Sequence, residues 1–273
     1  MATFKKAKMV NLPDEIIDQV NKMWMPDIAR VDGQCDLHGP FEANAMIFGG
    51  KTLGGACPVC LAERDAKDQE RQRAMQSDLE RRRIEGLFQR AGIPVRFQSR
   101  TFDNYQVNND GQERALRKAR AYADGWQQSV TAGTSLIFSG NAGTGKTHLA
   151  CAIANQLIAQ GVSAVFTTVS DAMRAIKRTY DADSQMTELQ AIQAFVDPGL
   201  LILDEVGANR GTEYEVQLVF DIINKRYENC RPTIILTNLD PQALRDCLGE
   251  RVVDRLREGG GKLVAFTWES FRA

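Results

Sequence analysis

The second half of the chain alternates short apolar runs with longer amphipathic stretches. The apolar runs predict buried β-strands at 136–139, 164–169, 200–203, 233–237 and 262–267. The stretches between them predict helices at 146–159, 170–180, 187–196, 213–229 and 241–248. A further helix, through Tyr122 and Trp126, precedes the first strand. Strands that alternate with helices are typical of a parallel sheet with helices on both faces.

The first 91 residues follow a different pattern. An amphipathic helix is predicted at 15–24 and ends before Pro26. Its apolar stripe consists of Ile16, Ile17, Val20, Met23 and Trp24. This stripe is equally consistent with a partner-binding element and with packing onto the rest of the chain. The segment 61–91 mixes charges of both signs with no Gly or Pro before Gly86, so it predicts a long solvated helix.

Composition and charge narrow the function classes. The 273 residues include 34 Lys and Arg against 35 Asp and Glu, a net charge of −1, so any DNA contact must come from local patches. An apolar signal core and a run long enough to span a bilayer are both missing from the sequence, which predicts a cytoplasmic protein. Six cysteines in that compartment favour metal ligands or free thiols over disulfides.

A G-x-x-x-x-G-K-T motif directly follows the strand predicted at 136–139 and opens the next helix. Its glycines allow backbone N–H groups to turn toward a polyphosphate, and the helix N-terminus attracts the same charge. Lys146 is expected to reach the β- and γ-phosphates, and Thr147 to bind Mg²⁺. The predicted nucleotide-binding residues are Gly140, Asn141, Ala142, Gly143, Thr144, Gly145, Lys146, Thr147 and His148.

Two carboxylates follow the apolar run 200–203, at the strand end where open α/β sheets bind ligands. Asp204 is expected to hold Mg²⁺ through water, and Glu205 to orient or deprotonate the attacking water. Asn238 ends the strand 233–237 and either positions the same water or only begins the turn before Asp240.

Arg251 and Arg255 are four residues apart and share one helical face. A guanidinium delivered to a neighbouring subunit stabilises the charge that develops on a γ-phosphate. A surface salt bridge with Asp254 or Glu258 is the alternative.

Four side chains have the spacing of a zinc site. Cys35 and His38 form a C-x2-H pair, and Cys57 and Cys60 form a C-x2-C pair. Four ligands leave no open position, so the predicted Zn²⁺ is structural, and residues 35–60 have few apolar side chains with which to fold without it.

These motifs, together with the segments 249–255 and 266–272, resemble the AAA+ domain of the DnaC-type bacterial replicative helicase loaders over about residues 100–273. The resemblance implies that Arg255 is the arginine finger with Arg251 beside it, and that Arg272 is the sensor II arginine. It also implies single-stranded DNA contacts, which fall on Tyr180, Thr212 and Tyr214. The zinc segment is foreign to that template and resembles loaders encoded by phages and prophages.

The sequence therefore predicts an α/β protein, in which a small helical, zinc-binding domain precedes an AAA+ P-loop NTPase domain. The expected boundaries are 1–91 for the N-terminal domain, 92–111 for a linker and the start of the ATPase domain, and 112–273 for the AAA+ domain. The expected cofactors are ATP, Mg²⁺ and Zn²⁺. The resemblance implies an ATPase that self-associates head-to-tail, binds the hexameric replicative helicase through its N-terminal domain and acts on single-stranded DNA. A transposition-helper ATPase acting on duplex DNA and a non-hydrolysing zinc-stabilised adaptor are the alternatives.

Overall fold

The computed structural model describes residues 27–48, 51–181, 183–208 and 212–271. The chain divides into two compact units, Met1–Asp78 and Leu79–Ala273. The amphipathic helix predicted at 15–24 lies outside the described residues.

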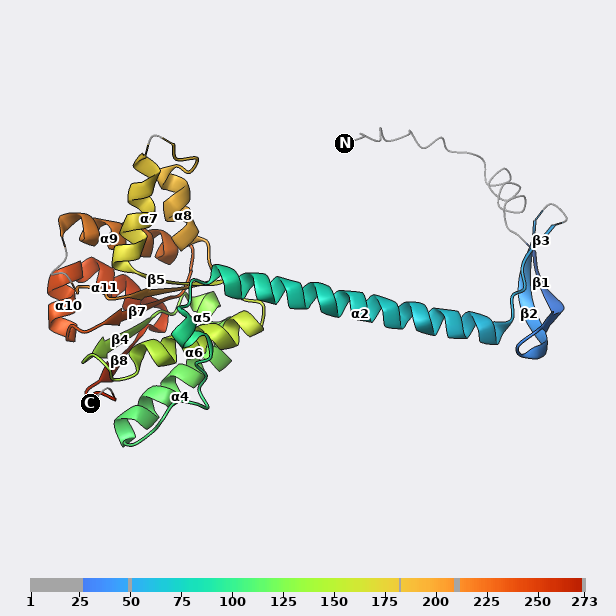
Figure 1. The fold of residues 1–273 in the computed structure, drawn as a ribbon, viewed down its shortest axis with the longest axis horizontal. Helices are drawn as coiled ribbons and strands as arrows, with labels where there is room; N and C mark the ends of the chain where they lie inside the picture. The colour runs from blue at the N-terminus through green and yellow to red at the C-terminus, as the bar shows by residue number, and fades with distance from the viewer. Residues whose placement is uncertain (1–26, 49–50, 182, 209–211, 272–273) are drawn as a thin grey trace, which may run out of the picture. The chain divides into compact units, whose positions relative to one another are not determined.

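The first unit contains a three-stranded antiparallel sheet in the order β1-β2-β3 (Figure 1). Its strands are β1 (Asp27–Cys35), β2 (Gly39–Phe48) and β3 (Lys51–Gly54). Cys35 pairs with Gly39 across the turn between β1 and β2, and Gly39 has a φ of 75°, a left-handed conformation that glycine adopts at low cost. This turn places Cys35 and His38 at one end of the sheet.

The long solvated helix is confirmed as α2 (Pro58–Arg90). It begins three residues earlier than predicted, at Pro58, whose fixed φ suits the first turn of a helix. None of its residues is buried. Near its end, within the second unit, Leu87 and Phe88 pack against the larger core.

The second unit is built on a five-stranded parallel sheet, which confirms the predicted fold class. The strand order is β5-β6-β7-β4-β8. The strands are β4 (Leu136–Gly140), β5 (Ala164–Thr168), β6 (Leu200–Asp204), β7 (Thr233–Thr237) and β8 (Lys262–Phe266).

Helices cover both faces of this sheet (Figure 1). Leu136 and Phe138 of β4 join one core with α4 (Asp110–Asp124), α5 (Trp126–Ala132) and α6 (Lys146–Ala159). Ile137, which points the other way, joins a second core with α9 (Glu213–Glu228), α10 (Pro241–Leu248) and α11 (Glu250–Arg257). The remaining α-helices of the described residues are α3 (Val95–Gln98), α7 (Val169–Lys177) and α8 (Glu188–Val196).

The strand order decides where the candidate site lies. β7 pairs with β4 on one side and with β6 on the other, all in parallel. The carboxyl ends of these three strands therefore place Gly140, Asn238 and Asp204 side by side at one edge of the sheet. Among the described helices, none is both long enough and apolar enough to cross a membrane.

Candidate nucleotide site and metal-binding cluster

The loop between β4 and α6 is folded around the side chain of Lys146. The ammonium group donates hydrogen bonds to the carbonyl oxygens of Gly140 at 2.6 Å and Asn141 at 2.7 Å, and to Asn238 Oδ1 at 2.9 Å. Gly140 has a φ of 142°, and a Cβ at this position would lie 2.1 Å from the carbonyl oxygen of Phe266. Only glycine therefore fits at position 140, where the loop leaves β4. The three hydrogen bonds fix the Lys146 side chain against the start of the loop.

The two side chains predicted to hold Mg²⁺ lie in contact. Thr147 Oγ1 donates a hydrogen bond to Asp204 Oδ2 at 3.2 Å. The other carboxylate oxygen, Oδ1, accepts the N–H of Glu205 at 2.7 Å, and Glu205 turns the chain sharply with a φ of 60°. Burial raises the pKa of Asp204 above its usual range, an effect that a bound cation would oppose. A hydroxyl and a carboxylate are the oxygen ligands that Mg²⁺ prefers.

These groups open onto a cleft of about 620 Å³, within the range of small-molecule sites. One wall is the loop 142–148, with Asp204, Glu205 and Asn238. Residues of the segment 94–106, Phe166 and Thr168 of β5, and Phe271 also line the cleft. Residues 92–111, predicted from the sequence as a linker and the start of the ATPase domain, thus include part of the wall of this cleft, which the sequence pattern did not indicate.

An aromatic cluster supports the loop from the side of segment 94–106. The rings of Tyr105 and His148 meet edge-on with centroids 5.1 Å apart, and His148 Nε2 lies 3.0 Å from the carbonyl oxygen of Thr101. Burial lowers the pKa of His148, which favours the neutral imidazole. His148 therefore ties the start of α6 to the segment that lines the cleft.

Two of the three predicted arginines, Arg251 and Arg255, lie on α11 and outside the lining of this cleft. Arg251 is exposed on α11, and Arg255 is half-buried, with its guanidinium carbon 5.2 Å from the ring centre of Phe220 and 5.6 Å from that of Tyr227. The described lining of the cleft contains neither arginine. Arg272 lies outside the described residues.

The residues that the resemblance assigns to DNA gather on one exposed surface. The side chains of Tyr180 and Tyr214 are 59% and 37% exposed, and the Lys177 ammonium lies 5.4 Å from the Tyr214 ring centre. Hydrogen bonds to Glu188 and Tyr214 raise the pKa of Tyr180. Thr212 is the N-cap of α9, where its hydroxyl accepts the N–H of Glu215 at 3.3 Å.

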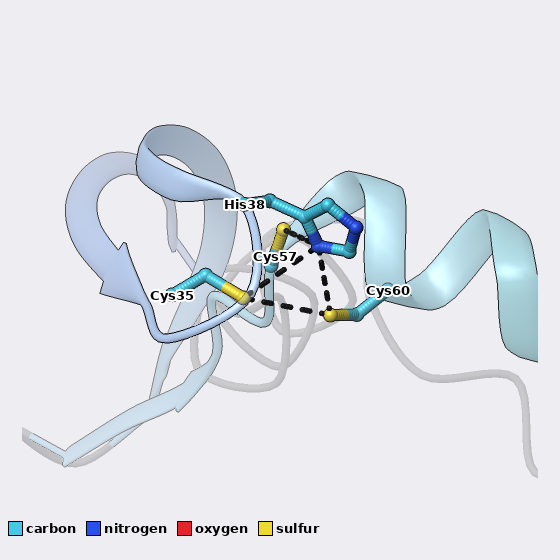
Figure 2. Close-up of side chains that lie close together, drawn as sticks. All are labelled: Cys35, His38, Cys57 and Cys60. Carbon is cyan, nitrogen blue, oxygen red and sulfur yellow. Dashed lines mark hydrogen bonds between the residues drawn. The ribbon is translucent and has the colours of Figure 1, made fainter.

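The four cysteine and histidine side chains predicted to bind zinc do converge in the first unit. Figure 2 shows them pointing toward one another from the β1–β2 turn and the start of α2. His38 Nδ1 lies 3.3 Å from the sulfur of Cys60 and 3.7 Å from those of Cys35 and Cys57. Ligands of one tetrahedral Zn²⁺ are about 3.5–3.8 Å apart, given its usual bond lengths. The donor set therefore fits a zinc ion.

Two further features suit a metal. Backbone N–H groups of Leu37 and His38 lower the pKa of the Cys35 thiol to about 6, so this sulfur is readily a thiolate. The Cys60 sulfur lies 3.5 Å from that of Cys35, close to the spacing of two ligands of one Zn²⁺. His38 Nε2 lies 3.5 Å from Glu63, which can orient the ring so that Nδ1 faces the thiols. Glu63 was not predicted from the sequence, although its position one turn after Cys60, on the predicted helix, is a usable signal.

Comparison with known proteins places this geometry in a family. The model of the IstB-like ATP binding proteins matches residues 70–259. The chain belongs to this family. The replicative helicase loader DnaC of Escherichia coli K12 is 37% identical over 203 residues, which cover 74% of this chain and 81% of that protein. The resemblance to the AAA+ domain of DnaC-type loaders, predicted from the motifs, is thereby confirmed.

Two further similarities agree with this assignment. The uncharacterized protein YdaV of E. coli K12 is 40% identical over 190 residues, which cover 70% of this chain and 75% of that protein. A crystal structure of the DnaC helicase loader has a TM-score of 0.56 and 27% identity, and the match covers 63% of this chain and 99% of that chain. The family membership supports ATPase activity in this AAA+ domain.

Replacing Lys146 with alanine should raise the dissociation constant for ATP at least about 100-fold, since it removes the positive charge that is expected to reach the β- and γ-phosphates. Titration calorimetry with magnesium present measures this directly. Lys118→Ala, on the exposed face of α4, removes the same charge elsewhere and should leave binding unchanged. Equal affinity in the Lys146 variant and the unmodified chain would contradict the assignment of the loop.

Proposed function

We propose that this protein is an ATP-dependent loader that delivers a hexameric replicative DNA helicase to single-stranded DNA. The observation that carries the proposal is the arrangement of Lys146, Thr147, Asp204 and Asn238 around one cleft, in a chain 37% identical to a replicative helicase loader. ATP binding and hydrolysis would switch the loader between helicase-bound and released states.

The side chains at the sheet edge divide the work of hydrolysis. Lys146 would neutralise charge on the β- and γ-phosphates, and Thr147 and Asp204 would hold Mg²⁺, which would supply further positive charge for the reaction. Glu205 orients the attacking water and accepts its proton. Asn238, which accepts a hydrogen bond from Lys146 through its amide oxygen, would position that water through its amide nitrogen.

A second copy of the chain would complete the site. Arg251 and Arg255 lie outside the described lining of the cleft, as a finger directed at a neighbour requires. The aromatic rings of Phe220 and Tyr227 restrict the Arg255 side chain on its own subunit. Such contacts are head-to-tail and produce an open spiral when the rotation does not close. Arg272 would contact nucleotide within its own subunit.

Single-stranded DNA would pass along the surface formed by Tyr180, Tyr214 and Thr212. An exposed phenol stacks on any base, and the nearby Lys177 supplies the positive charge that a phosphate backbone attracts. The Thr212 hydroxyl already accepts a hydrogen bond as the cap of α9, and it retains its proton to donate to a phosphate.

The first unit would hold the helicase. Its zinc ion would tie the β1–β2 turn to the first turn of α2 through Cys35, His38, Cys57 and Cys60, and the ion would be structural because all four positions are filled by the chain.

A transposition-helper ATPase is the second candidate, because the matching family model is named for the IstB-like proteins. One pair of measurements separates the candidates: ATPase rates with single-stranded and with duplex DNA, and co-purification with the replicative helicase with and without ATP. A loader should respond to single-stranded DNA and retain the helicase in a manner that depends on ATP. Stimulation by duplex DNA alone, without helicase retention, would favour the transposition helper. An ATPase rate that stays at background under every condition would instead favour the non-hydrolysing adaptor.

The purified chain should contain about one zinc ion per molecule, by mass spectrometric metal analysis, because the four ligand atoms fit one tetrahedral ion. Cys60→Ser should lose most of the zinc and lower the midpoint of thermal unfolding of the first unit. Cys230→Ser changes an exposed thiol outside the cluster and should keep the full content. Unchanged zinc in the Cys60 variant would rule out this site.

A further inference from the structure

The phosphate loop depends on donors from the far end of the chain. A loop that offers its N–H groups to a ligand must satisfy its carbonyl groups elsewhere. Lys146 serves the first two carbonyls, of Gly140 and Asn141. Two later carbonyls of the loop, those of Gly143 and Thr144, accept hydrogen bonds from residues that follow β8.

These two bonds come from different kinds of donor. The indole N–H of Trp268 donates to the carbonyl oxygen of Thr144 at 2.9 Å, and the backbone N–H of Phe271 donates to that of Gly143 at 3.0 Å. Thr144 is fully buried, so its carbonyl has little access to water as a substitute donor. The segment after β8 therefore forms a strap along the outer side of the loop.

The indole is itself held in place. Its ring lies 4.9 Å from that of Phe266, the last residue of β8, which is paired with Gly140 at the end of β4. On the other side, a Cβ added at Gly111, in the first turn of α4, would come within 2.9 Å of the indole ring. The Trp268 nitrogen thus has one orientation, fixed by the sheet and by α4.

Phe271 connects the strap to the opposite wall of the cleft. Its ring meets that of Tyr105 edge-on, with centroids 6.3 Å apart, and both residues line the cleft. Tyr105 in turn lies against the loop, since a Cβ at Gly145 would be 2.8 Å from its ring. The loop is therefore enclosed between Tyr105 and the strap.

We propose that Trp268 and Phe271 are positioning residues for the nucleotide, holding the carbonyl groups of Thr144 and Gly143 turned away from the phosphates. A carbonyl without its donor could rotate toward the cleft, where it would repel a phosphate oxygen and remove an N–H from the cradle. The inference rests on the proposed ATP site and adds to it a determinant of phosphate affinity outside the motif.

The test is Trp268→Phe, which removes the indole N–H and keeps an aromatic ring in a half-buried position. Fluorescence anisotropy with mant-ATP and mant-ADP, at fixed magnesium, should show both dissociation constants raised about 3- to 10-fold, the effect of one lost hydrogen bond to a buried acceptor. In steady-state hydrolysis KM for ATP should rise while kcat stays unchanged, because the loop contact is made before the chemical step.

Trp126→Phe is the matched control, since Trp126 is buried on α5 in the same core and contacts Tyr122. It should leave both dissociation constants unchanged. Affinity within twofold of the unmodified chain for Trp268→Phe, or an equal loss in the Trp126 variant, would overturn the inference while leaving the ATP site in place. A lower kcat at unchanged KM would also overturn it, since that result indicates a smaller active fraction. Failure of the unmodified chain to bind mant-ATP would instead overturn the proposed function, and the inference with it.

Discussion

The backbone of the phosphate loop carries the central constraint of this structure. In the proposed complex the N–H groups of this loop bind the phosphates, so they cannot pair with the loop's own carbonyl groups. Each buried carbonyl therefore needs a hydrogen-bond donor from elsewhere in the chain. Here the Lys146 ammonium serves Gly140 and Asn141, and the segment after β8 serves Gly143 and Thr144. The order of the sheet makes this possible, because β8 lies beside β4 and its continuation emerges next to the loop.

The same edge of the sheet gathers the chemistry. Asn238 reaches the loop lysine because β7 is paired with β4, and Asp204 reaches Thr147 because β6 lies one strand further. The mutual contacts of these side chains satisfy polar groups that would otherwise be buried without a partner. The first unit would be stabilised differently, because four Cys and His ligands around one metal ion can take the place of a hydrophobic core.

Much of the fold was predictable because its signals are local. The strands of the parallel sheet are buried on both faces and read as continuous apolar runs, and the loop motif and the C-x2-C spacing each lie within a few residues. The small sheet β1-β2-β3 was missed although its shielded positions alternate with exposed, mostly polar ones, because several of the shielded residues are alanine or glycine and give only a weak apolar signal. Other contacts join residues that lie far apart in the sequence. They include those of Trp268 with the loop, Tyr105 with His148, Glu63 with His38, and Arg255 with the aromatic ring of Phe220 on α9. Such contacts exist only once the chain has folded.

The claim that unites these features is that one chain supplies the phosphate loop and a second supplies the arginine. Mixing two inactive variants tests it most directly, with hydrolysis measured as the ratio of Lys146→Ala to Arg255→Ala chains is varied at constant total protein. The Arg255 variant keeps an intact loop and the Lys146 variant keeps an intact arginine, so mixed neighbours assemble one complete site. The account predicts that hydrolysis rises well above that of either variant alone and peaks at intermediate ratios. Hydrolysis that stays at the level of the separate variants at every ratio would contradict it.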